Sequence, residues 1–181
     1  MSATVVGLTG PTGAGKSTVA GILRELGAKV LDADAIVQTF GTKVLGEDKE
    51  IDRRKLAEEV FADPNKLAKL ERILHPRVIA RILEARKMLR ERDVLVVEAI
   101  KLLESGLRNV CDEVWIVLAP RESMLDRLEQ RGLPRSEAEL RLRNQYSEEQ
   151  YRKAADVVIE NDAGRDQLTA RVRAEWARLR A

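Results

Sequence analysis

The sequence predicts an α/β fold in which a parallel sheet of five strands lies between two layers of helices. Five short segments are rich in β-branched residues and apolar on both faces, as strands covered by helices on both sides must be. Amphipathic stretches separate these segments, and right-handed crossovers would place such helices on both faces of the sheet. A glycine-rich pattern at 10–17 follows the first strand, at the end of the sheet where folds of this class bind ligands.

The elements are expected in alternating order along the chain. The predicted strands are 4–8, 28–31, 94–97, 114–118 and 157–159. The predicted helical stretches are 16–26, 52–90, 121–131, 136–151 and 165–180. Because the carboxyl ends of parallel strands meet at one edge of a sheet, the loops at Thr9, Asp32, Glu98 and Ala119 should face one site.

The length of 181 residues suits a single domain. We expect its core at about 1–40, 93–126 and 154–181, a helical substrate-binding insert at about 41–92, and an arginine-rich lid at about 127–153. Segments of this kind can close over a substrate to exclude water. Residues 41–48 are the predicted mobile connector.

Composition and charge narrow the classes of protein to consider. The chain has 44% apolar and 34% charged residues with a net charge of +2, and the charges are interspersed, so we expect no nucleic-acid partner. Its one cysteine, Cys111, excludes an internal disulfide and fits a reducing compartment. With no run of roughly 18 apolar residues and no signal peptide, we expect a cytoplasmic protein without a membrane partner. The oligomeric state is not predicted.

The pattern G-x-x-x-x-G-K-[ST] at 10–17 predicts a binding site for a nucleoside triphosphate. Glycines let backbone N–H groups surround a β-phosphate, Lys16 supplies a charge to the β and γ oxygens, and the Ser17 hydroxyl can ligate Mg²⁺. The helix that begins at Lys16 adds its positive dipole end. The alternative is a glycine-rich turn that only joins a strand to a helix. The expected nucleotide contacts are Gly10, Pro11, Thr12, Gly13, Ala14, Gly15, Lys16, Ser17 and Thr18.

Asp32 and Asp34 follow the second predicted strand at its carboxyl end. Alternate side chains of an extended segment point the same way, so both carboxylates could approach the phosphates. A hydroxyl that attacks a γ-phosphate needs a carboxylate to orient it, and Mg²⁺ needs oxygen ligands. The alternative is structural: Asp34 would cap a helix beginning at Ala35, and Asp32 would form a turn.

Further blocks occur in a fixed order across nearly the whole chain. They are Thr9-Gly10 with the phosphate loop, Val30-Leu31-Asp32-Ala33-Asp34, Leu74-His75-Pro76, Glu104-Ser105-Gly106-Leu107, Arg141-x-x-x-Gln145 and the segment 155–161. Together they resemble the dephospho-CoA kinase family. The resemblance implies a three-layer P-loop NTPase fold and ATP- and Mg²⁺-dependent phosphorylation of the 3′-hydroxyl of dephospho-CoA, the last step of coenzyme A synthesis.

The resemblance also implies roles for the residues expected around the bound ATP. Asp34 becomes the candidate catalytic base, and Asp32 a metal or positioning partner. Lys16 would stabilise the transferring phosphoryl group. Asn161 lies where the family's adenine-binding loop begins, although asparagine is also a common turn residue.

The lid and the insert receive roles in the same way. Arg141 is the best candidate among the lid arginines, because an always-charged guanidinium suits a developing phosphoryl charge. Arg127, Arg131 and Arg135 stand behind it, and each could instead belong to a solvated helix face. His75 and Arg77 would hold the acceptor, or His75 would end one helix while Pro76 starts the next.

The chain departs from the family pattern in two places. The family usually carries a block resembling D-I-P-L-L-F-E-S-G, but here Glu98 stands for the aspartate, Ile100 for the proline and Lys101 for an apolar residue. Glu98 and Lys101 are therefore candidate substrate contacts, and Lys101 could equally be a surface lysine. The stretch between Asp34 and Asp52 is about a dozen residues shorter than usual, which would trim the insert.

Three functions remain open on the sequence. Dephospho-CoA kinase explains every block with one mechanism. A P-loop kinase for another hydroxyl acceptor, such as a nucleoside, a nucleotide monophosphate or a shikimate-like polyol, is kept open by Lys101 and the short insert. A nucleotide-dependent switch ATPase is disfavoured, because the chain has neither an N-K-x-D signature nor a D-x-x-G switch after a strand.

Overall fold

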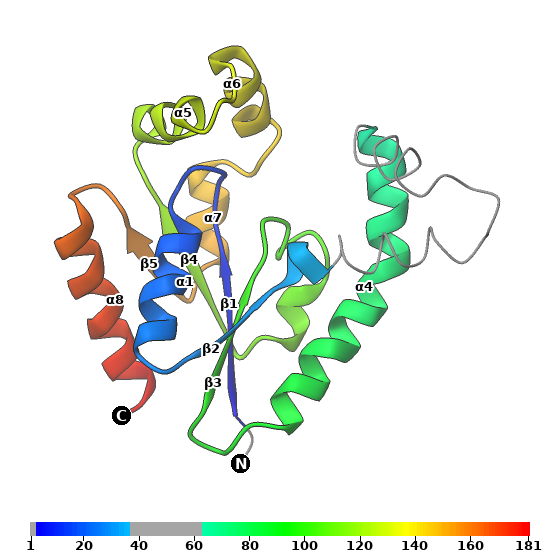
Figure 1. The fold of residues 1–181 in the computed structure, drawn as a ribbon, viewed down its shortest axis with the longest axis vertical. Helices are drawn as coiled ribbons and strands as arrows, with labels where there is room; N and C mark the ends of the chain where they lie inside the picture. The colour runs from blue at the N-terminus through cyan, green and yellow to red at the C-terminus, as the bar shows by residue number, and fades with distance from the viewer. Residues whose placement is uncertain (1–2, 37–62) are drawn as a thin grey trace.

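A five-stranded parallel sheet forms the centre of the molecule, in the strand order β2-β3-β1-β4-β5 (Figure 1). The computed structural model describes residues 3–36 and 63–181. The strands are β1 Thr4–Thr9, β2 Lys29–Asp32, β3 Val94–Glu98, β4 Glu113–Leu118 and β5 Val157–Glu160. The predicted parallel sheet is therefore confirmed, and every strand begins and ends within one residue of its expected position.

Helices cover both faces of the sheet, so the three-layer prediction is also confirmed (Figure 1). The described helices are α1 Lys16–Glu25, α4 Pro64–Lys87, α5 Arg121–Gln130, α6 Arg135–Arg143, α7 Glu148–Ala154, α8 Arg165–Leu179 and the 3-10 helix η1 Leu107–Val110. Helices α1 and α8 lie on one face, and α4, η1 and α7 on the other. Helices α5 and α6 extend beyond the carboxyl ends of the strands.

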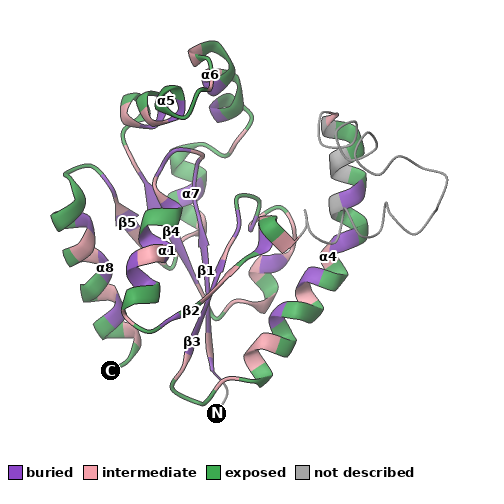
Figure 2. Ribbon diagram, in the orientation of Figure 1, coloured by how far each residue is buried: buried purple, intermediate pink, exposed green. Residues whose placement is uncertain are grey.

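Successive side chains of each strand point to opposite faces of the sheet, so the core is divided into two clusters. Val6 and Leu8 of β1 pack with residues of α1 and α8, whereas Val5 packs with Val78 and Ile82 of α4. Both clusters are buried, as Figure 2 shows by the inward faces of the helices. The sheet is thus apolar on both faces because both faces are covered, which is what the unbroken apolar runs predicted.

The prediction of one continuous helix at 136–151 is wrong, because the structure has two helices there. Helix α6 ends at Arg143, and α7 begins at Glu148. Ser147 is the reason for the second start: its hydroxyl accepts from the backbone N–H of Gln150, whose side chain in turn accepts from the N–H of Ser147. This capping box begins a new helix and lets the chain turn from the lid back to the sheet.

A helix boundary at Pro76 was the structural alternative for His75, and that alternative is wrong. Helix α4 continues through Pro76 and is not interrupted there. The missing N–H of Pro76 removes one backbone hydrogen bond, but burial of Leu74, Val78 and Ile82 against the rest of the protein offsets that loss. The insert therefore meets the sheet through one long helix.

Several expectations lie outside the described residues. These are the mobile connector at 41–48, most of the shortened stretch that begins after Asp34, and the part of the insert before residue 63. Within the described residues, no helix is both long enough and apolar enough to cross a membrane.

Candidate active site

The phosphate-binding pattern forms a tight loop between β1 and α1. Gly10, Gly13 and Gly15 all have positive φ angles, of 140°, 84° and 105°. A Cβ atom on Gly10 would lie 2.2 Å from the carbonyl oxygen of Val117, and one on Gly15 would lie 2.3 Å from Nδ2 of Asn161. Only glycine fits these positions, so the pattern reflects both backbone conformation and close packing against neighbouring loops.

Lys16 is folded back onto this loop. Its Nζ atom donates hydrogen bonds to the carbonyl oxygens of Gly10, at 2.9 Å, and Pro11, at 3.0 Å. The residue is only 7% exposed. Burial lowers the pKa of Lys16 to about 8, and the nearby carboxylates of Glu98 and Asp34 oppose that shift. The structure therefore holds a desolvated ammonium group at the base of the loop.

Two carboxylates approach Lys16 and Ser17 from neighbouring strands. Glu98, at the end of β3, accepts a hydrogen bond from the Ser17 hydroxyl at 2.9 Å. Asp34 accepts from the backbone N–H of Ile100 at 3.0 Å. Burial raises the pKa of Asp34 above its usual value, the bond from Ile100 opposes that shift, and the charge of Asp32 adds to it.

Asp32 and Asp34 have different structural roles, and the structural alternative in which Asp34 caps the helix is wrong. Asp32 accepts from the backbone N–H of Ala35 at 2.9 Å, so it caps the helix that begins at Ala33. Asp34 lies inside that helix and reaches across to the loop after β3. The carboxylate of Asp34 is thereby left beside Lys16, in the environment that a catalytic base requires.

These residues surround one cavity of about 260 Å³. Its lining consists of Thr12, Gly13, Gly15, Lys16, Ser17, Thr18, Asp32, Asp34, Glu98, Ile100 and Arg131. The fold thus brings together the loop, both aspartates and Glu98, although they are far apart in the sequence. Such a cavity can hold phosphate oxygens against backbone N–H groups and a buried cation, with carboxylates facing them.

The lid arginines are arranged differently from the expected order. Arg131 lines the cavity, and Arg127 donates to the carbonyl oxygens of Gly13 and Ala14 at 3.1 and 3.2 Å. Arg141, the expected leading residue, is exposed and pairs with Glu137 of its own helix at 2.8 Å. The third supporting residue, Arg135, bonds to Glu122 and Glu129 within the lid.

Four further predicted contacts, Asn161, Lys101, His75 and Arg77, do not line the cavity. Asn161 is buried, and its Nδ2 donates to the carbonyl oxygen of Ala14 at 2.7 Å, so it supports the loop from behind. Lys101 follows Ile100 and is exposed. His75 and Arg77 lie on α4, half-buried and exposed respectively. Their contacts with a nucleotide or an acceptor stay predictions.

Gln145 is a contact that the sequence did not predict. Its Oε1 accepts from the backbone N–H of Thr12 at 2.9 Å, and its Nε2 donates to the Thr12 hydroxyl at 2.8 Å. The segment between α6 and α7 is thereby attached to the tip of the phosphate loop. The only signal in the sequence was the place of Gln145 in a block with Arg141, which gave it no partner.

The cavity also suits a divalent cation beside a triphosphate. The Ser17 hydroxyl and the carboxylates of Asp32 and Glu98 face the same space, and oxygen ligands of this kind are what Mg²⁺ takes together with phosphate oxygens. Among the described residues, no three acidic, histidine or cysteine side chains are gathered closely enough to hold a metal by themselves. The donor set therefore fits an ion bound jointly with the nucleotide.

Comparison with known proteins agrees with this geometry. Residues 4–167 match the family model described as dephospho-CoA kinase. A dephospho-CoA kinase of Streptomyces avermitilis is 40% identical over 96% of this chain and 93% of its own length. One from Thermobifida fusca is 38% identical over 71% of this chain, and there the match spans 65% of the relative, just under two thirds.

A solved structure shares the fold over the whole chain. The crystal structure of TT1252 from Thermus thermophilus is 34% identical to this chain, with a TM-score of 0.81 and 99% of each chain covered. The family match includes the phosphate loop, Asp34 and Gln145, and extends through β5 into α8. The chain therefore belongs to the dephospho-CoA kinase family.

Proposed function

We propose that this protein transfers the γ-phosphoryl group of ATP to the 3′-hydroxyl of dephospho-CoA, giving coenzyme A and ADP. The observation that carries the proposal is the cavity in which Asp34, Lys16 and the phosphate loop face one another. Membership of the dephospho-CoA kinase family supplies the acceptor. This would make the reaction the final step of coenzyme A synthesis.

The phosphate loop is the proposed donor site. Its backbone N–H groups and the N-terminus of α1 would bind the phosphates of ATP, with Gly10 to Thr18 in contact. Lys16 would leave the carbonyl oxygens of Gly10 and Pro11 and bind β and γ oxygens, where its charge stabilises the transition state. Asn161 would adjoin the adenine ring while it supports Ala14.

Asp34 is the proposed catalytic base. It lies in the same cavity as Lys16, and its raised pKa makes it a better proton acceptor than an ordinary carboxylate. The 3′-hydroxyl would donate a hydrogen bond to Asp34, which orients the oxygen for in-line attack and takes its proton.

Mg²⁺ is the proposed metal cofactor, held by Ser17 and Asp32 with phosphate oxygens, and with Glu98 beside them. When bound, it would neutralise charge on the β- and γ-phosphates. Ser17 now donates to Glu98, and that hydroxyl would turn its oxygen toward the ion. Asp32 keeps one oxygen on the Ala35 N–H, which fixes the direction of its carboxylate.

The lid and the acceptor side complete the proposed site. Arg141 would reach the transferring phosphoryl group when the lid closes, and Arg131 already lines the phosphate cavity. Glu98 and Lys101, at the end of β3 and in the loop after it, and His75 and Arg77 on α4, are the proposed contacts with dephospho-CoA. We propose a cytoplasmic protein that acts on this small molecule, with no nucleic-acid or membrane partner.

ADP release from ATP and Mg²⁺ tests the proposal directly. The purified protein is assayed without an acceptor, with dephospho-CoA, and with a panel of nucleosides, nucleotide monophosphates and shikimate. Stimulation by dephospho-CoA, with coenzyme A identified as product, is the expected result. Stimulation by another acceptor alone would favour the kinase alternative that Lys101 keeps open, and acceptor-independent turnover would favour a switch ATPase.

A further inference from the structure

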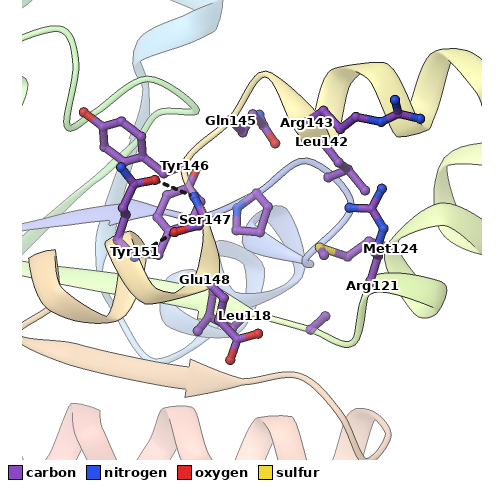
Figure 3. Close-up of a pocket in the computed structure, with 13 residues that line it drawn as sticks. Leu118, Arg121, Met124, Leu142, Arg143, Gln145, Tyr146, Ser147, Glu148 and Tyr151 are labelled. Atoms are coloured by element: carbon purple, nitrogen blue, oxygen red, sulfur yellow. Dashed lines mark hydrogen bonds between the residues drawn. The ribbon is translucent and has the colours of Figure 1, made fainter.

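A second cavity, of about 520 Å³, lies between the lid, α7 and the phosphate loop (Figure 3). Its lining includes Arg121 and Met124 from α5, Leu142 from α6, and Tyr146 and Tyr151 from the region of α7. The volume falls within the range of sites that bind small molecules. The lining is a mixture of apolar, aromatic and positively charged side chains, with one carboxylate, Glu148, that pairs with Arg152.

This cavity adjoins the phosphate cavity and shares none of its lining residues. Pro11 lines the second cavity, and the next residue, Thr12, lines the first. Gln145 lines the second cavity as well and holds Thr12 through two hydrogen bonds. A ligand could therefore occupy the second cavity and reach the transferring phosphoryl group past Pro11 and Thr12, without displacing the donor nucleotide.

Charge and ring chemistry indicate the kind of ligand. Arg121 and Arg143 both line the cavity, and the side chain of Arg121 has no hydrogen bond or ion pair with another residue in the described part of the chain. Among the described residues, the side chain of Arg143 pairs only with the half-buried Glu139 of its own helix. Tyr146, which is 36% exposed, lies at the opposite side of the cavity from these two arginines (Figure 3). Guanidinium groups bind phosphates, and an exposed aromatic ring can stack on a nucleobase.

Tyr151, which lines the cavity, carries a buried polar group without a partner in the described part of the structure. The residue is 2% exposed, and its hydroxyl has no hydrogen-bond partner among the described residues. Its ring lies 5.7 Å from that of Tyr146, between centroids, at a tilt of 60°. Burial raises the pKa of Tyr151, so the hydroxyl keeps its proton. A buried hydroxyl without a partner destabilises the free protein, and a ligand that pairs with it would recover the loss.

We propose that this second cavity binds the adenosine 5′-diphosphate end of the acceptor, with the adenine on Tyr146 and the diphosphate on Arg121 and Arg143. The inference rests on the proposed function, since it deepens the identity of the acceptor site. The ribose would lie at Pro11 and Thr12, with its 3′-hydroxyl directed into the phosphate cavity. The pantetheine arm would extend outward, because it has neither a ring to stack nor a negative charge for the two arginines.

Calorimetric titration can separate the two ends of the acceptor. The donor site is first saturated with adenylyl imidodiphosphate, an ATP analogue that cannot transfer its phosphoryl group. Dephospho-CoA, AMP and 4′-phosphopantetheine are then titrated separately into the wild type and into Tyr146→Leu and Arg121→Ala variants. Arg173→Ala is the matched control, because Arg173 is exposed on α8, on the other face of the sheet.

The expected result is a weakening of dephospho-CoA and AMP binding by roughly tenfold in each cavity variant, with the control unchanged. Binding of 4′-phosphopantetheine should stay within about twofold of the wild type in Tyr146→Leu, because this half of the acceptor has no adenine, and should weaken in Arg121→Ala through its single phosphate. Loss of 4′-phosphopantetheine binding in Tyr146→Leu, or unchanged dephospho-CoA binding in both variants, would overturn the inference. A wild type that neither binds nor phosphorylates dephospho-CoA would show that the proposed function itself had failed.

Tyr151→Phe supplies a second, independent readout. Removing an unpaired buried hydroxyl should raise the melting temperature of the free protein. The same change should weaken AMP binding by roughly fivefold, because the ligand loses a hydrogen bond. A higher melting temperature with unchanged AMP binding would contradict the assignment of this hydroxyl to the ligand.

Discussion

Gln145 holds Thr12 through both polar atoms of its side-chain amide, one accepting from the backbone N–H and one donating to the hydroxyl. The two residues are 133 positions apart in the sequence. The contact joins the segment between α6 and α7 to the tip of the phosphate loop. Gln145 is therefore a positioning residue for the loop, and movement of the lid can be transmitted to Thr12 through it.

Replacing Gln145 tests this role. Gln145→Ala removes both hydrogen bonds, so we expect the KM for ATP to rise roughly tenfold and the free energy of unfolding to fall by about 1–2 kcal/mol. Gln145→Glu keeps the acceptor for the Thr12 N–H, and the Thr12 hydroxyl can turn to donate, so KM should largely recover. Steady-state kinetics and denaturant unfolding measure the two effects. Gln167→Ala, on the exposed surface of α8, is the control.

The lowered pKa of Lys16 leads us to expect that nucleotide binding depends on pH. Its pKa is about 8 in the free protein, and the negative charge of a bound triphosphate must raise it. Above pH 8 the protein has to take up a proton to bind, so affinity for adenylyl imidodiphosphate should fall by up to about tenfold per pH unit. Below about pH 7 Lys16 is already charged, and this dependence should vanish.

A Lys16→Met variant is the control for this titration. It should bind the analogue weakly and show no decline between about pH 8 and 9.5, because the titrating group is gone. A decline as steep as that of the wild type would mean that another group is responsible. The same variant should have almost no kinase activity, since the charge that stabilises the transferring group is absent.

Asp34→Asn should lower kcat by about 10²- to 10⁴-fold while adenylyl imidodiphosphate still binds. The raised pKa of Asp34 also gives a direction for the acid side of the pH profile. Activity needs the ionised carboxylate, so kcat should fall as pH is lowered through a value above that of an ordinary aspartate. In the Asn variant that fall should disappear.

Asp32→Asn distinguishes the two aspartates. An asparagine side chain can still accept from the Ala35 N–H, so the helix cap survives while the charge is lost. We expect a higher Mg²⁺ requirement and a smaller loss of kcat than in Asp34→Asn. If Asp32→Asn lost kcat and Asp34→Asn retained it, Asp32 would be the base.

Replacing Pro76 should stabilise the protein. It lies on an exposed position inside α4, where its ring cannot donate to the carbonyl oxygen of Arg72. Pro76→Ala restores that donor and should raise the free energy of unfolding by about 1–2 kcal/mol, after allowing for the greater freedom of the unfolded chain. Urea unfolding measures the change. A lower stability would mean that α4 needs the local geometry that proline imposes.

The sheet and the phosphate loop could be predicted because their signals are local. The β-branched run of β1 and the glycines of the loop specify a buried strand and a tight turn within a dozen neighbouring residues. Asp32 and Asp34 were placed correctly at the carboxyl end of β2 for the same reason. Which of them caps the helix was not readable, because a shift of two residues in the helix start exchanges their roles.

The remaining features depend on contacts between distant segments. Nothing near Gln145 indicates that Thr12 is its partner, and nothing near Arg131 indicates that it, and not Arg141, lines the phosphate cavity. The direction of a lid side chain depends on where α5 and α6 end relative to the sheet. Sequence spacing within a helix does not contain that information.

The hydrogen bond from Ile100 to Asp34 means that the loop after β3 affects the proton affinity of a group in the helix after β2. The donor is a main-chain N–H, so every residue type at position 100 supplies it except proline, which has none. A proline there would leave the carboxylate with one partner fewer and a still higher pKa. A substitution at position 100 can therefore shift the acidity of the proposed catalytic group without changing the group itself.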